Sequence, residues 1–337
     1  MSFNLEDYDY YLPNNLIANY PLADRASSKL LVYNRKNDEI THTIVREIDQ
    51  FIPREHALIF NNSKVIKARI FGEKSSGGKI EILIARDTSN GVLSRVKGKV
   101  RVGSRLVFAA NLTAIVAETF DNGDRVLKFF ENENAINFAR LIEITDKIGV
   151  VPLPPYIKRA AEIKDIDSYQ SCFAKIYGSA AAPTASLHFD QNLLETLRKN
   201  HNFAEITLHI GLGTFANIEA NDIRDHKMHF ESYFISEKAA EIINSDQQIL
   251  AIGTTACRAT EFYFRNKELS GECDLFLNPE NPPKRINALM TNFHLPKSTL
   301  FILISSMIGL EKTREIYAAA IANKYRFFSY GDAMLII

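Results

Sequence analysis

The arrangement of apolar runs changes near residue 155, and this change constrains the fold more than any other feature of the chain. Between residues 57 and 130, short apolar stretches are separated by turns that contain Gly, Asn and Ser. Strands of this length and spacing are typical of a small antiparallel barrel. After residue 155, apolar stretches alternate with helical ones, which indicates an α/β layer.

These patterns predict the individual elements. In the first region we expect strands at residues 57–60, 65–71, 79–85, 92–96, 105–108, 114–117 and 126–130, followed by a short amphipathic helix at 135–144. In the second region we expect strands at 204–210 and 249–252 and helices at 189–200, 237–244, 256–265, 299–308 and 311–323. Two short stretches, 15–17 and 30–33, are assigned to the same layer. The prolines within 150–157 predict a rigid crossing segment.

The predicted architecture is an α/β (α+β) body with an inserted small antiparallel β-barrel domain. Residues 1–60 and 151–337 are expected to form a discontinuous α/β domain, and residues 61–150 the inserted barrel. A chain of 337 residues is long enough for two such domains.

Composition excludes several classes of protein. The chain is 46% hydrophobic and 24% charged, as in ordinary globular proteins. No apolar run reaches the roughly 18 residues of a membrane span, and the N-terminus does not resemble a signal peptide. The three cysteines lack CxxC spacing, which fits a reducing compartment. We therefore expect a cytoplasmic protein with no membrane partner.

Charge is distributed unevenly although the formal net charge is zero. Residues 61–105 contain eleven Lys or Arg against three Asp or Glu, whereas residues 1–60 contain six basic and nine acidic groups. A basic segment of this kind is expected where one face contacts a phosphate backbone. A solvated, partly paired surface explains the same counts equally well.

Five segments in the second half combine Gly, small residues and polar groups with His or aromatic residues. They are residues 178–189, 208–215, 226–231, 291–299 and 325–332. Such departures from packing rules in several places indicate a functional site, here a pocket built from loops.

Two of the expected strands end in glycine-containing turns. Gly211, Gly213 and Thr214 follow one strand, and Gly253-Thr254-Thr255 follows another, before a helix that contains Arg258. Backbone N–H groups in such turns can approach an anionic or zwitterionic ligand closely. Neither turn matches GxGxxG or a P-loop, and ordinary tight turns remain the alternative.

Histidines are concentrated in these segments. His188, His209, His226 and His229 are candidates for general acid–base catalysis, and His294 for substrate binding. There is no HExxH pattern and no cysteine pairs with them, so no metal is expected. The alternative is that these histidines cap loops in the core.

The last two segments supply further binding candidates. Lys297 lies beside His294 at an expected helix start. Tyr330 and Asp332 belong to an aromatic and polar stretch that suits stacking on a nucleobase. The same stretch also fits a C-terminal strand that packs Phe327 and Tyr330 into the core.

With these segments assembled, the sequence resembles the S-adenosylmethionine:tRNA ribosyltransferase-isomerase family of queuosine biosynthesis. The resemblance extends over nearly the whole chain. Besides the five segments, it includes residues 8–10, 21–25, 28–32, 60–72, 77–81 and 151–159. This chain departs from the family pattern at Lys67, at Ser186 and Asp190, and in the loop 278–283.

The resemblance implies a reaction. The ribosyl group of S-adenosylmethionine is transferred to 7-aminomethyl-7-deazaguanine at the tRNA wobble position and isomerised, giving epoxyqueuosine, adenine and methionine. S-adenosylmethionine is a substrate, so no prosthetic group is expected. The expected partners are that tRNA and S-adenosylmethionine, and the expected assembly is a monomer or a weak homodimer.

This chemistry needs a base beside the sulfonium, a proton donor to departing adenine, and a neutral attacking amine. His188 and His229 are the first candidates, with Asp225 or Glu231 orienting one of the histidines. Arg258 and Lys297 are expected to bind the methionine carboxylate. The candidates for tRNA phosphates are Arg69, Lys97, Lys99 and Arg101.

Two other classes of protein remain as alternatives. One is a tRNA-binding module without catalysis, in which only the basic barrel is functional. The other is an RNA methyltransferase, which would leave S-adenosylhomocysteine instead of adenine and methionine.

Overall fold

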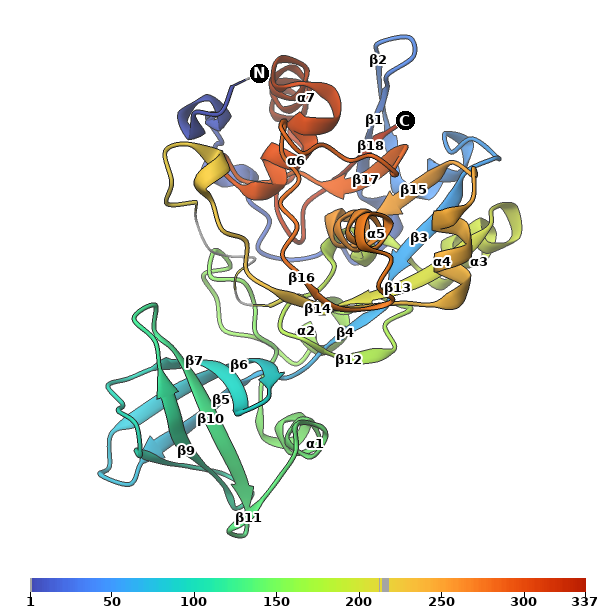
Figure 1. Ribbon diagram of the computed structural model, residues 1–337. Coiled ribbons are helices and arrows are strands. Elements are labelled where there is room, and N and C mark those ends of the chain that lie inside the picture. Colours follow the sequence, from blue (N-terminus) through green and yellow to red (C-terminus); the bar gives the residue numbers. More distant parts are fainter. Residues whose placement is uncertain (1, 212, 214–217) are drawn as a thin grey trace.

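The computed structural model describes residues 2–211, 213 and 218–337. Its strands form a nine-stranded mixed sheet, a closed antiparallel barrel and a separate two-stranded pair. The barrel lies beside the layered body that contains the large sheet (Figure 1). This arrangement confirms the predicted fold class of an α/β body with a small antiparallel barrel.

The body is built on the nine-stranded sheet. In sheet order its strands are β16 (Ser270–Cys273), β14 (Glu231–Ile235), β13 (Phe203–Leu208), β3 (Ala57–Asn61), β15 (Ile249–Ile252), β17 (Ala288–Asn292), β18 (Ala333–Ile336), β1 (Lys29–Asn34) and β2 (Glu39–Ile44). The four neighbours β13, β3, β15 and β17 are mutually parallel. Their carboxyl ends therefore lie at one edge of the sheet.

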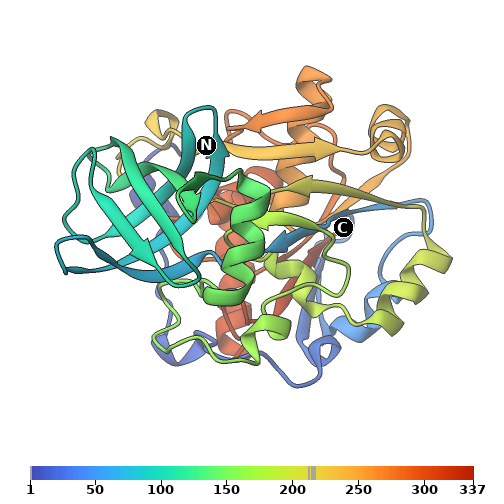
Figure 2. The ribbon, with the colours of Figure 1, turned by 90° about the horizontal axis from the view of Figure 1, so that it is seen from below.

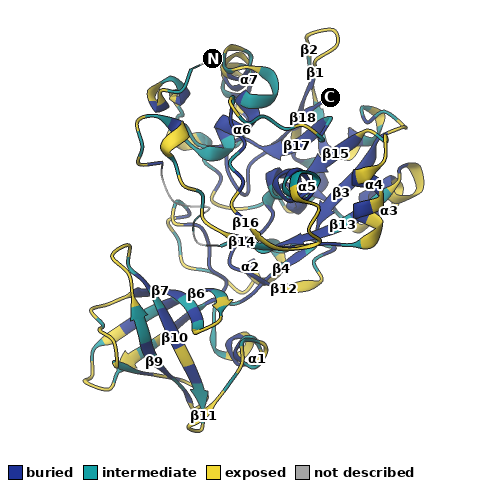
Figure 3. Cartoon of the chain, viewed as in Figure 1, coloured by how far each residue is buried: buried dark blue, intermediate teal, exposed yellow. Residues whose placement is uncertain are grey.

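Helices cover both faces of this sheet. They are α3 (Gln191–Asn200), α4 (Glu237–Asn244), α5 (Thr254–Asn266), α6 (Thr299–Ile308) and α7 (Leu310–Ala322). Alternate residues of β3 point to opposite faces, so Ala57 and Ile59 pack with α4 and α5, whereas Leu58 and Phe60 pack with α3. All residues of β3 are buried because both faces are covered (Figure 3).

The barrel strands pair in the order β10, β7, β6, β5, β8 and β9, and a β10–β9 pairing closes the ring. They are β5 (Arg69–Lys74), β6 (Lys79–Thr88), β7 (Gly91–Lys97), β8 (Arg105–Phe108), β9 (Leu112–Thr119) and β10 (Asp124–Glu131), with β11 (Asn134–Ala135) beside β10. Inward residues such as Ile82 and Leu127 are fully buried. Helix α1 (Phe138–Ile148) packs Leu141 and Ile144 against this interior.

Two connections join the barrel to the body. Strand β4 (Ser63–Val65) pairs in parallel with β12 (Ile176–Ser179) before the chain enters the barrel. On return, Val150 and Arg69 exchange backbone hydrogen bonds of 2.9 and 3.3 Å. The chain then passes the short helix α2 (Asp165–Ser168). Seen from below, α1 lies between the barrel and the body (Figure 2).

Several predicted elements differ from the observed ones. The predicted strand 65–71 is divided into β4 and β5, because Ala68 N donates to Ile66 O and turns the chain between them. Residues 15–17 form no strand of the sheet, since Asn14–Leu16 is a 3-10 turn. The helix predicted from residue 135 begins at Phe138, where Asn137 caps it. Strands β2, β14, β16 and β17 were not predicted.

The fold carries no candidate membrane span in its described part. Within residues 2–211, 213 and 218–337, the helices are all too short or too polar to cross a bilayer. The longest helices in the described part of the chain, α5 and α7, each have 13 residues.

Candidate functional site

The parallel strands of the body bring their carboxyl ends together through Asn61. Its Nδ2 donates to Leu208 O (3.0 Å) and to Thr255 Oγ1 (3.1 Å), and its Oδ1 accepts from Leu208 N (3.0 Å). One side chain therefore fixes the ends of β3 and β13 and the start of α5. Both glycine-containing turns predicted from sequence lie at this edge, where α/β proteins commonly bind ligands.

A cavity of about 430 Å³ opens at this edge. Its lining includes the N-terminal residues of α5 and α6, the small-residue turn 181–185, and the ends of β13 and β17. Of the predicted residues, Thr254, Thr255, His294 and Lys297 line it. A cavity of this size is within the range of small-molecule sites.

Aromatic residues form one wall of the cavity. The rings of Tyr156 and Phe328 lie 4.3 Å apart between centroids, and the Tyr156 hydroxyl hydrogen-bonds Ser329 Oγ. Burial raises the pKa of Tyr156 to about 12, so this phenol stays protonated at neutral pH. Since Tyr156 follows directly on the proline segment that leaves the barrel, the predicted crossing segment contributes to the cavity wall.

Two buried polar side chains in the lining are held by neighbouring groups. They are Tyr169 and Asn292, each 1% exposed. Asn292 Nδ2 donates to Phe328 O (2.9 Å), and the Asn292 side chain also hydrogen-bonds the His188 ring. The Tyr169 hydroxyl interacts with the Ala182 backbone and with Ser329. These contacts fix the polar part of the cavity wall.

His188 lies beside this cavity at the end of a 3-10 helix, Thr184–His188, whose first residues line it. His188 also lines a small neighbouring hollow that shares Ser329 with the cavity. Its ring hydrogen-bonds the side chain of Asn292. Burial lowers the pKa of His188 to about 4, Arg326 acts in the same direction, and the nearby Asn292 side chain opposes them. His188 is therefore neutral at pH 7 and able to accept a proton.

His294 is a second buried histidine, and it lines the cavity itself. Its Nε2 lies 2.8 Å from Thr291 Oγ1, and its backbone N–H donates to Tyr317 Oη at 3.1 Å. Burial lowers the pKa of His294 to about 3. The ring is therefore a neutral hydrogen-bonding group in a fixed orientation.

His209 lies at the end of β13 but outside the cavity lining. Its Nδ1 is 2.7 Å from Ser63 Oγ, and burial lowers its pKa to about 4. The ring packs on Gly178, where an added Cβ would lie 2.8 Å from His209 Cε1. A side chain at position 178 would collide with the His209 ring, which explains why this residue is a glycine.

His226 and His229 lie outside the cavity lining, in the segment that leads into β14. His226 contacts the Phe276 ring at 5.4 Å, and burial, followed by His229, lowers its pKa. His229 is exposed and packs on Gly213, where any Cβ would collide with its ring. Thr214, predicted beside Gly213, lies outside the described residues.

Arg258 does not line the cavity, in contrast to the expectation that it binds a carboxylate. It is buried, with Nη1 2.5 Å from Glu231 Oε2 and Nε donating to Leu275 O (3.1 Å). Glu231 Oε1 also accepts from Gly211 N (3.1 Å). Arg258 thus acts through Glu231 on the backbone of the turn after β13.

Lys297 reaches the cavity but its ammonium is already paired. Nζ lies 2.7 Å from Glu6 and 3.2 Å from Asp9, and these hydrogen bonds raise its pKa. Its backbone has a φ of 54° and donates to Tyr8 O at 2.9 Å.

Tyr330 and Asp332 support the walls instead of contacting the main cavity. Tyr330 Oη donates to Asp165 (3.1 Å), and its ring borders the hollow that contains His188. Asp332 accepts from the backbone N–H of Lys29 (3.1 Å) and of Arg326 (2.8 Å). Asp332 therefore joins β1 to the turn before β18.

The predicted tRNA-contacting residues divide into two kinds. Lys97, Lys99 and Arg101 are exposed at and beyond the end of β7. Arg69 is half-buried, because it pairs with Glu81 at 3.3 Å and donates to Leu153 O at 3.4 Å. Arg69 therefore connects the barrel to the segment that forms the cavity wall.

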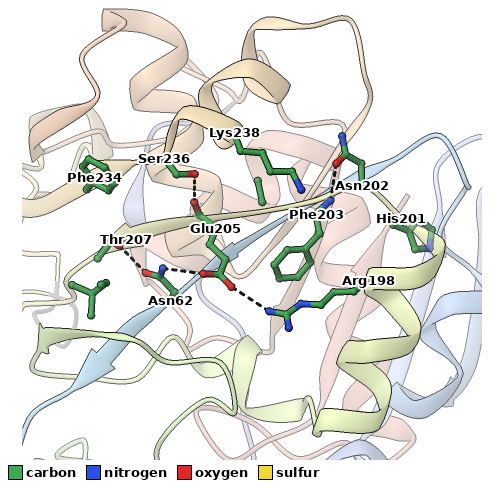
Figure 4. A pocket seen from close by; sticks show the side chains of 12 residues that line it. Asn62, Arg198, His201, Asn202, Phe203, Glu205, Thr207, Phe234, Ser236 and Lys238 are labelled. Atoms are coloured by element: carbon green, nitrogen blue, oxygen red, sulfur yellow. Dashed lines mark hydrogen bonds and ion pairs between the residues drawn. The ribbon is translucent and has the colours of Figure 1, made fainter.

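A second and larger hollow, about 760 Å³, lies over β13 (Figure 4). Its central carboxylate, Glu205, is paired with Lys175 (2.6 Å) and Arg198 (3.2 Å) and accepts from Asn62 Nδ2 (3.2 Å). These charged groups satisfy one another, although His201 Nδ1 in the same lining has no hydrogen-bond partner among the described residues. The cavity at the sheet edge differs in that it is lined by residues of several of the segments singled out from the sequence. We therefore place the functional site in the cavity at the sheet edge.

Sequence reasoning missed Tyr156, Tyr169 and Asn292 as site residues. Asn292 lies within a segment that the sequence analysis singled out, but the sequence pattern did not distinguish it from the neighbouring polar residues. Tyr156 was read only as part of a rigid connection. In the described part of the chain, no three His, Cys, Asp or Glu side chains are grouped as metal ligands.

The divergent loop at 278–283 is held at the far end of α5. Arg265 Nη2 donates to Pro282 O (2.9 Å), and Glu261 accepts from Lys284 N and Arg285 N. Since the cavity is at the first residues of α5, this loop does not contribute to its lining.

Comparison with known proteins gives a consistent result over the whole chain. A family profile described as "Queuosine biosynthesis protein" matches residues 5–336. A relative from Nitratiruptor sp., called S-adenosylmethionine:tRNA ribosyltransferase-isomerase, is 52% identical over 334 residues, which are 99% of this chain and 98% of that protein. A Campylobacter jejuni protein of the same name is 50% identical over 337 residues, again 99% and 98% of the two chains.

A solved structure is also similar. The crystal structure of S-adenosylmethionine tRNA ribosyltransferase from Thermotoga maritima matches with a TM-score of 0.55 and 32% sequence identity. The match covers 98% of this chain and 100% of that one.

Proposed function

The chain belongs to the queuosine biosynthesis protein family, and on that premise we propose that it transfers and isomerises the ribosyl group of S-adenosylmethionine. The acceptor is 7-aminomethyl-7-deazaguanine at the tRNA wobble position, and the products are epoxyqueuosine-tRNA, adenine and methionine. The observation that supports this activity at the sheet edge is the cavity of about 430 Å³, which has the buried His294 in its lining and the buried His188 beside it.

The cavity suits a ligand that is partly apolar and partly polar. Tyr156 and Phe328 offer aromatic surface to a purine or a ribose. Thr254, Thr255 and His294 offer hydrogen-bonding groups nearby. Enclosure by the body also limits water, which would otherwise compete for the reactive ribosyl group.

We assign different proton transfers to the inner and outer histidines. His188, neutral and beside the cavity, is the candidate base for the proton next to the sulfonium. His294 is the candidate hydrogen-bonding partner of adenine. His229, with His226 and His209 outside the cavity lining, is the candidate that removes a proton from the incoming amine.

The barrel is the proposed tRNA-contacting domain, with residues 61–150 as its limits and residues 1–60 and 151–337 as the catalytic domain. Lys97, Lys99 and Arg101 are exposed and available to phosphates. Arg69 acts indirectly, since it holds the return segment at Leu153. We further propose a cytoplasmic protein that works as a monomer or a weak homodimer, without a prosthetic group.

Product analysis tests the proposed function. The purified protein is incubated with S-adenosylmethionine and tRNA bearing the aminomethyl-deazaguanine base, and small products are measured by mass spectrometry. Adenine and methionine that form only with this tRNA support the proposal. S-adenosylhomocysteine would indicate a methyltransferase, and tRNA binding without any product would indicate a binding module.

A further inference from the structure

The outer face of the barrel carries an exposed aromatic side chain in a row of charged ones. Strands β5, β6 and β7 place Phe71, Glu81 and Lys97 directly opposite one another. Side chains alternate across a strand, so these three point outward, whereas Ile70 and Ile82 point into the barrel core. Phe71 is 57% exposed. An aromatic ring therefore stands in water at a position that the barrel core does not use.

The loops at one end of this row carry an excess of positive charge. They are the loop from β5 to β6 and the loop from β7 to β8, and they are adjacent because Lys74 Nζ donates to Lys99 O (3.4 Å). Residues 72–80 and 96–104 together contain one acid, Glu73, against five cations, Lys74, Lys79, Lys97, Lys99 and Arg101. A surface of this charge attracts a phosphate backbone.

The other end of the same outer face is continuous with the cavity wall. Arg69 lies two residues before Phe71 on the same side of β5, and it pairs with Glu81 (3.3 Å), so the charge of Glu81 is compensated. Arg69 also donates to Leu153 O (3.4 Å), and the chain continues from Leu153 to Tyr156 in the cavity lining. At a rise of about 3.3 Å per residue, Phe71 lies about 7 Å along the strand from Arg69. Phe71 therefore lies between the wall segment and the cationic loops.

We propose that Phe71 is a stacking platform for an unpaired base of the tRNA anticodon loop. With the wobble base in the cavity and phosphates on the cationic loops, neighbouring nucleotides cross the outer face of β5, β6 and β7. A cationic surface combined with an exposed aromatic ring is a common way to bind single-stranded RNA. The inference rests on the proposed function, because it takes tRNA as the substrate, and it adds a base contact to the phosphate contacts.

Phe71→Ala tests the stacking contact. Loss of the ring should raise the Kd for tRNA, measured by fluorescence anisotropy, by about 10- to 100-fold. The Kd for S-adenosylmethionine should stay within about twofold of wild type. Because Phe71→Ala removes no phosphate contact, log Kd should keep its dependence on log salt concentration, whereas Lys99→Glu should reduce it.

Two further substitutions at the same position separate stacking from apolar contact. Phe71→Trp keeps an aromatic face and should bind tRNA within about threefold of wild type. Phe71→Leu keeps the apolar bulk without the ring, so it should weaken tRNA binding as Phe71→Ala does, and it serves if Phe71→Ala does not fold. Phe120→Ala is the matched control, since Phe120 is also exposed (44%) but lies just beyond the end of β9, outside this row. It should leave both Kd values unchanged.

RNA fragments test whether the contact is to an unpaired base. An isolated anticodon stem–loop is compared with a continuous duplex that has the sequence of the same stem. Phe71→Ala should weaken binding of the stem–loop and leave binding of the duplex unchanged, because a duplex offers no unstacked base.

The outcomes separate the inference from the function on which it rests. If folded Phe71→Ala binds tRNA as tightly as wild type, or loses the stem–loop and the duplex equally, the stacking contact is wrong, and release of adenine and methionine by the wild-type protein still supports the proposed function. If the wild-type protein binds the stem–loop through Phe71 but releases neither product, the stacking contact stands and the proposed function fails.

Discussion

The barrel and the body use buried space in different ways. In the barrel, inward residues such as Ile70, Ile82 and Leu106 are apolar and alternate with exposed ones, as closure of an antiparallel sheet requires. In the body, the carboxyl edge of the sheet buries His188, His294 and Asn292 together. These polar groups are costly to bury, and the fold does not need them there.

This difference indicates how the two regions divide the work. The barrel presents its charges outward, where they can contact a phosphate backbone but form no enclosed site. The body encloses groups whose protonation and hydrogen bonding burial has altered. Under the proposed function, a reaction that must exclude water is expected in the body, and recognition of a large polyanion is expected on the barrel.

The largest expected effect is on catalysis, from His188→Gln. Loss of a general base should lower kcat by about 10²- to 10⁴-fold, measured as adenine release under saturating substrates. His201→Gln is the matched control, since His201 is also buried but bonds Asp49 (2.9 Å) away from the cavity. It is expected to affect stability and leave kcat near wild type. Equal losses of kcat in both variants would contradict a catalytic role for His188.

The buried ion pair of the body should contribute more to stability than any exposed pair. Glu231→Gln leaves the Arg258 charge uncompensated, so the free energy of unfolding should fall by about 3–5 kcal/mol, measured by urea denaturation. Asp24→Asn removes an exposed pair with Arg46 at the same 2.5 Å distance, and should cost less than about 1 kcal/mol. If the free energy of unfolding falls by a similar amount in the two variants, the expected difference between the buried and the exposed ion pair is wrong.

Stability should decrease at mildly acidic pH because of the body histidines. Burial lowers the pKa values of His188 and His209 to about 4 and that of His294 to about 3, from 6.5. The unfolded chain then binds more protons than the folded one below pH 6.5, so the free energy of unfolding falls as pH drops toward 4. Each histidine contributes up to about 1.4 kcal/mol per pH unit.

Urea unfolding at pH 7.5, 6.5 and 5.5 measures this dependence. The variant His294→Gln should flatten the slope, since glutamine does not titrate in this range. An unchanged slope would mean that His294 is charged in the folded protein.

The smallest effect is expected from single charges on the barrel. Lys99→Glu should raise KM for tRNA by a few-fold, about 1 kcal/mol, and reduce its salt dependence, while the Kd for S-adenosylmethionine stays unchanged. Lys128→Glu, an exposed change on β10, is the control for charge alone. If Lys128→Glu weakens tRNA binding as strongly as Lys99→Glu, the contact surface is broader than Lys97, Lys99 and Arg101.

The sequence predicted the regular parts of the molecule well. The predicted bounds agree with the observed ones for β8 (105–108), α4 (237–244), β15 (249–252) and α6 (299–308). In each of these segments the apolar residues follow the repeat of a single type of element, either a strand or a helix. Strands such as β16, which is mostly exposed, and β2, at the sheet edge, escaped detection because an edge strand needs no apolar alternation.

The site was predicted at the level of segments and less well at the level of side chains. The turns at Gly211 and Gly253 meet at one edge because their strands are parallel, which the sequence pattern indicated. The pairing of Arg258 with Glu231 and of Lys297 with Glu6 could not be predicted, since it depends on contacts between distant segments. The hydrogen bond between the side chains of Asn292 and His188 is likewise visible only in three dimensions.

A crystal structure of the protein with S-adenosylmethionine tests the central claim most directly. The claim predicts density for the ligand in the cavity between the first residues of α5 and α6, with the purine against Tyr156 or Phe328. Ligand density in the hollow around Glu205 or on the barrel, with this cavity empty, would contradict it.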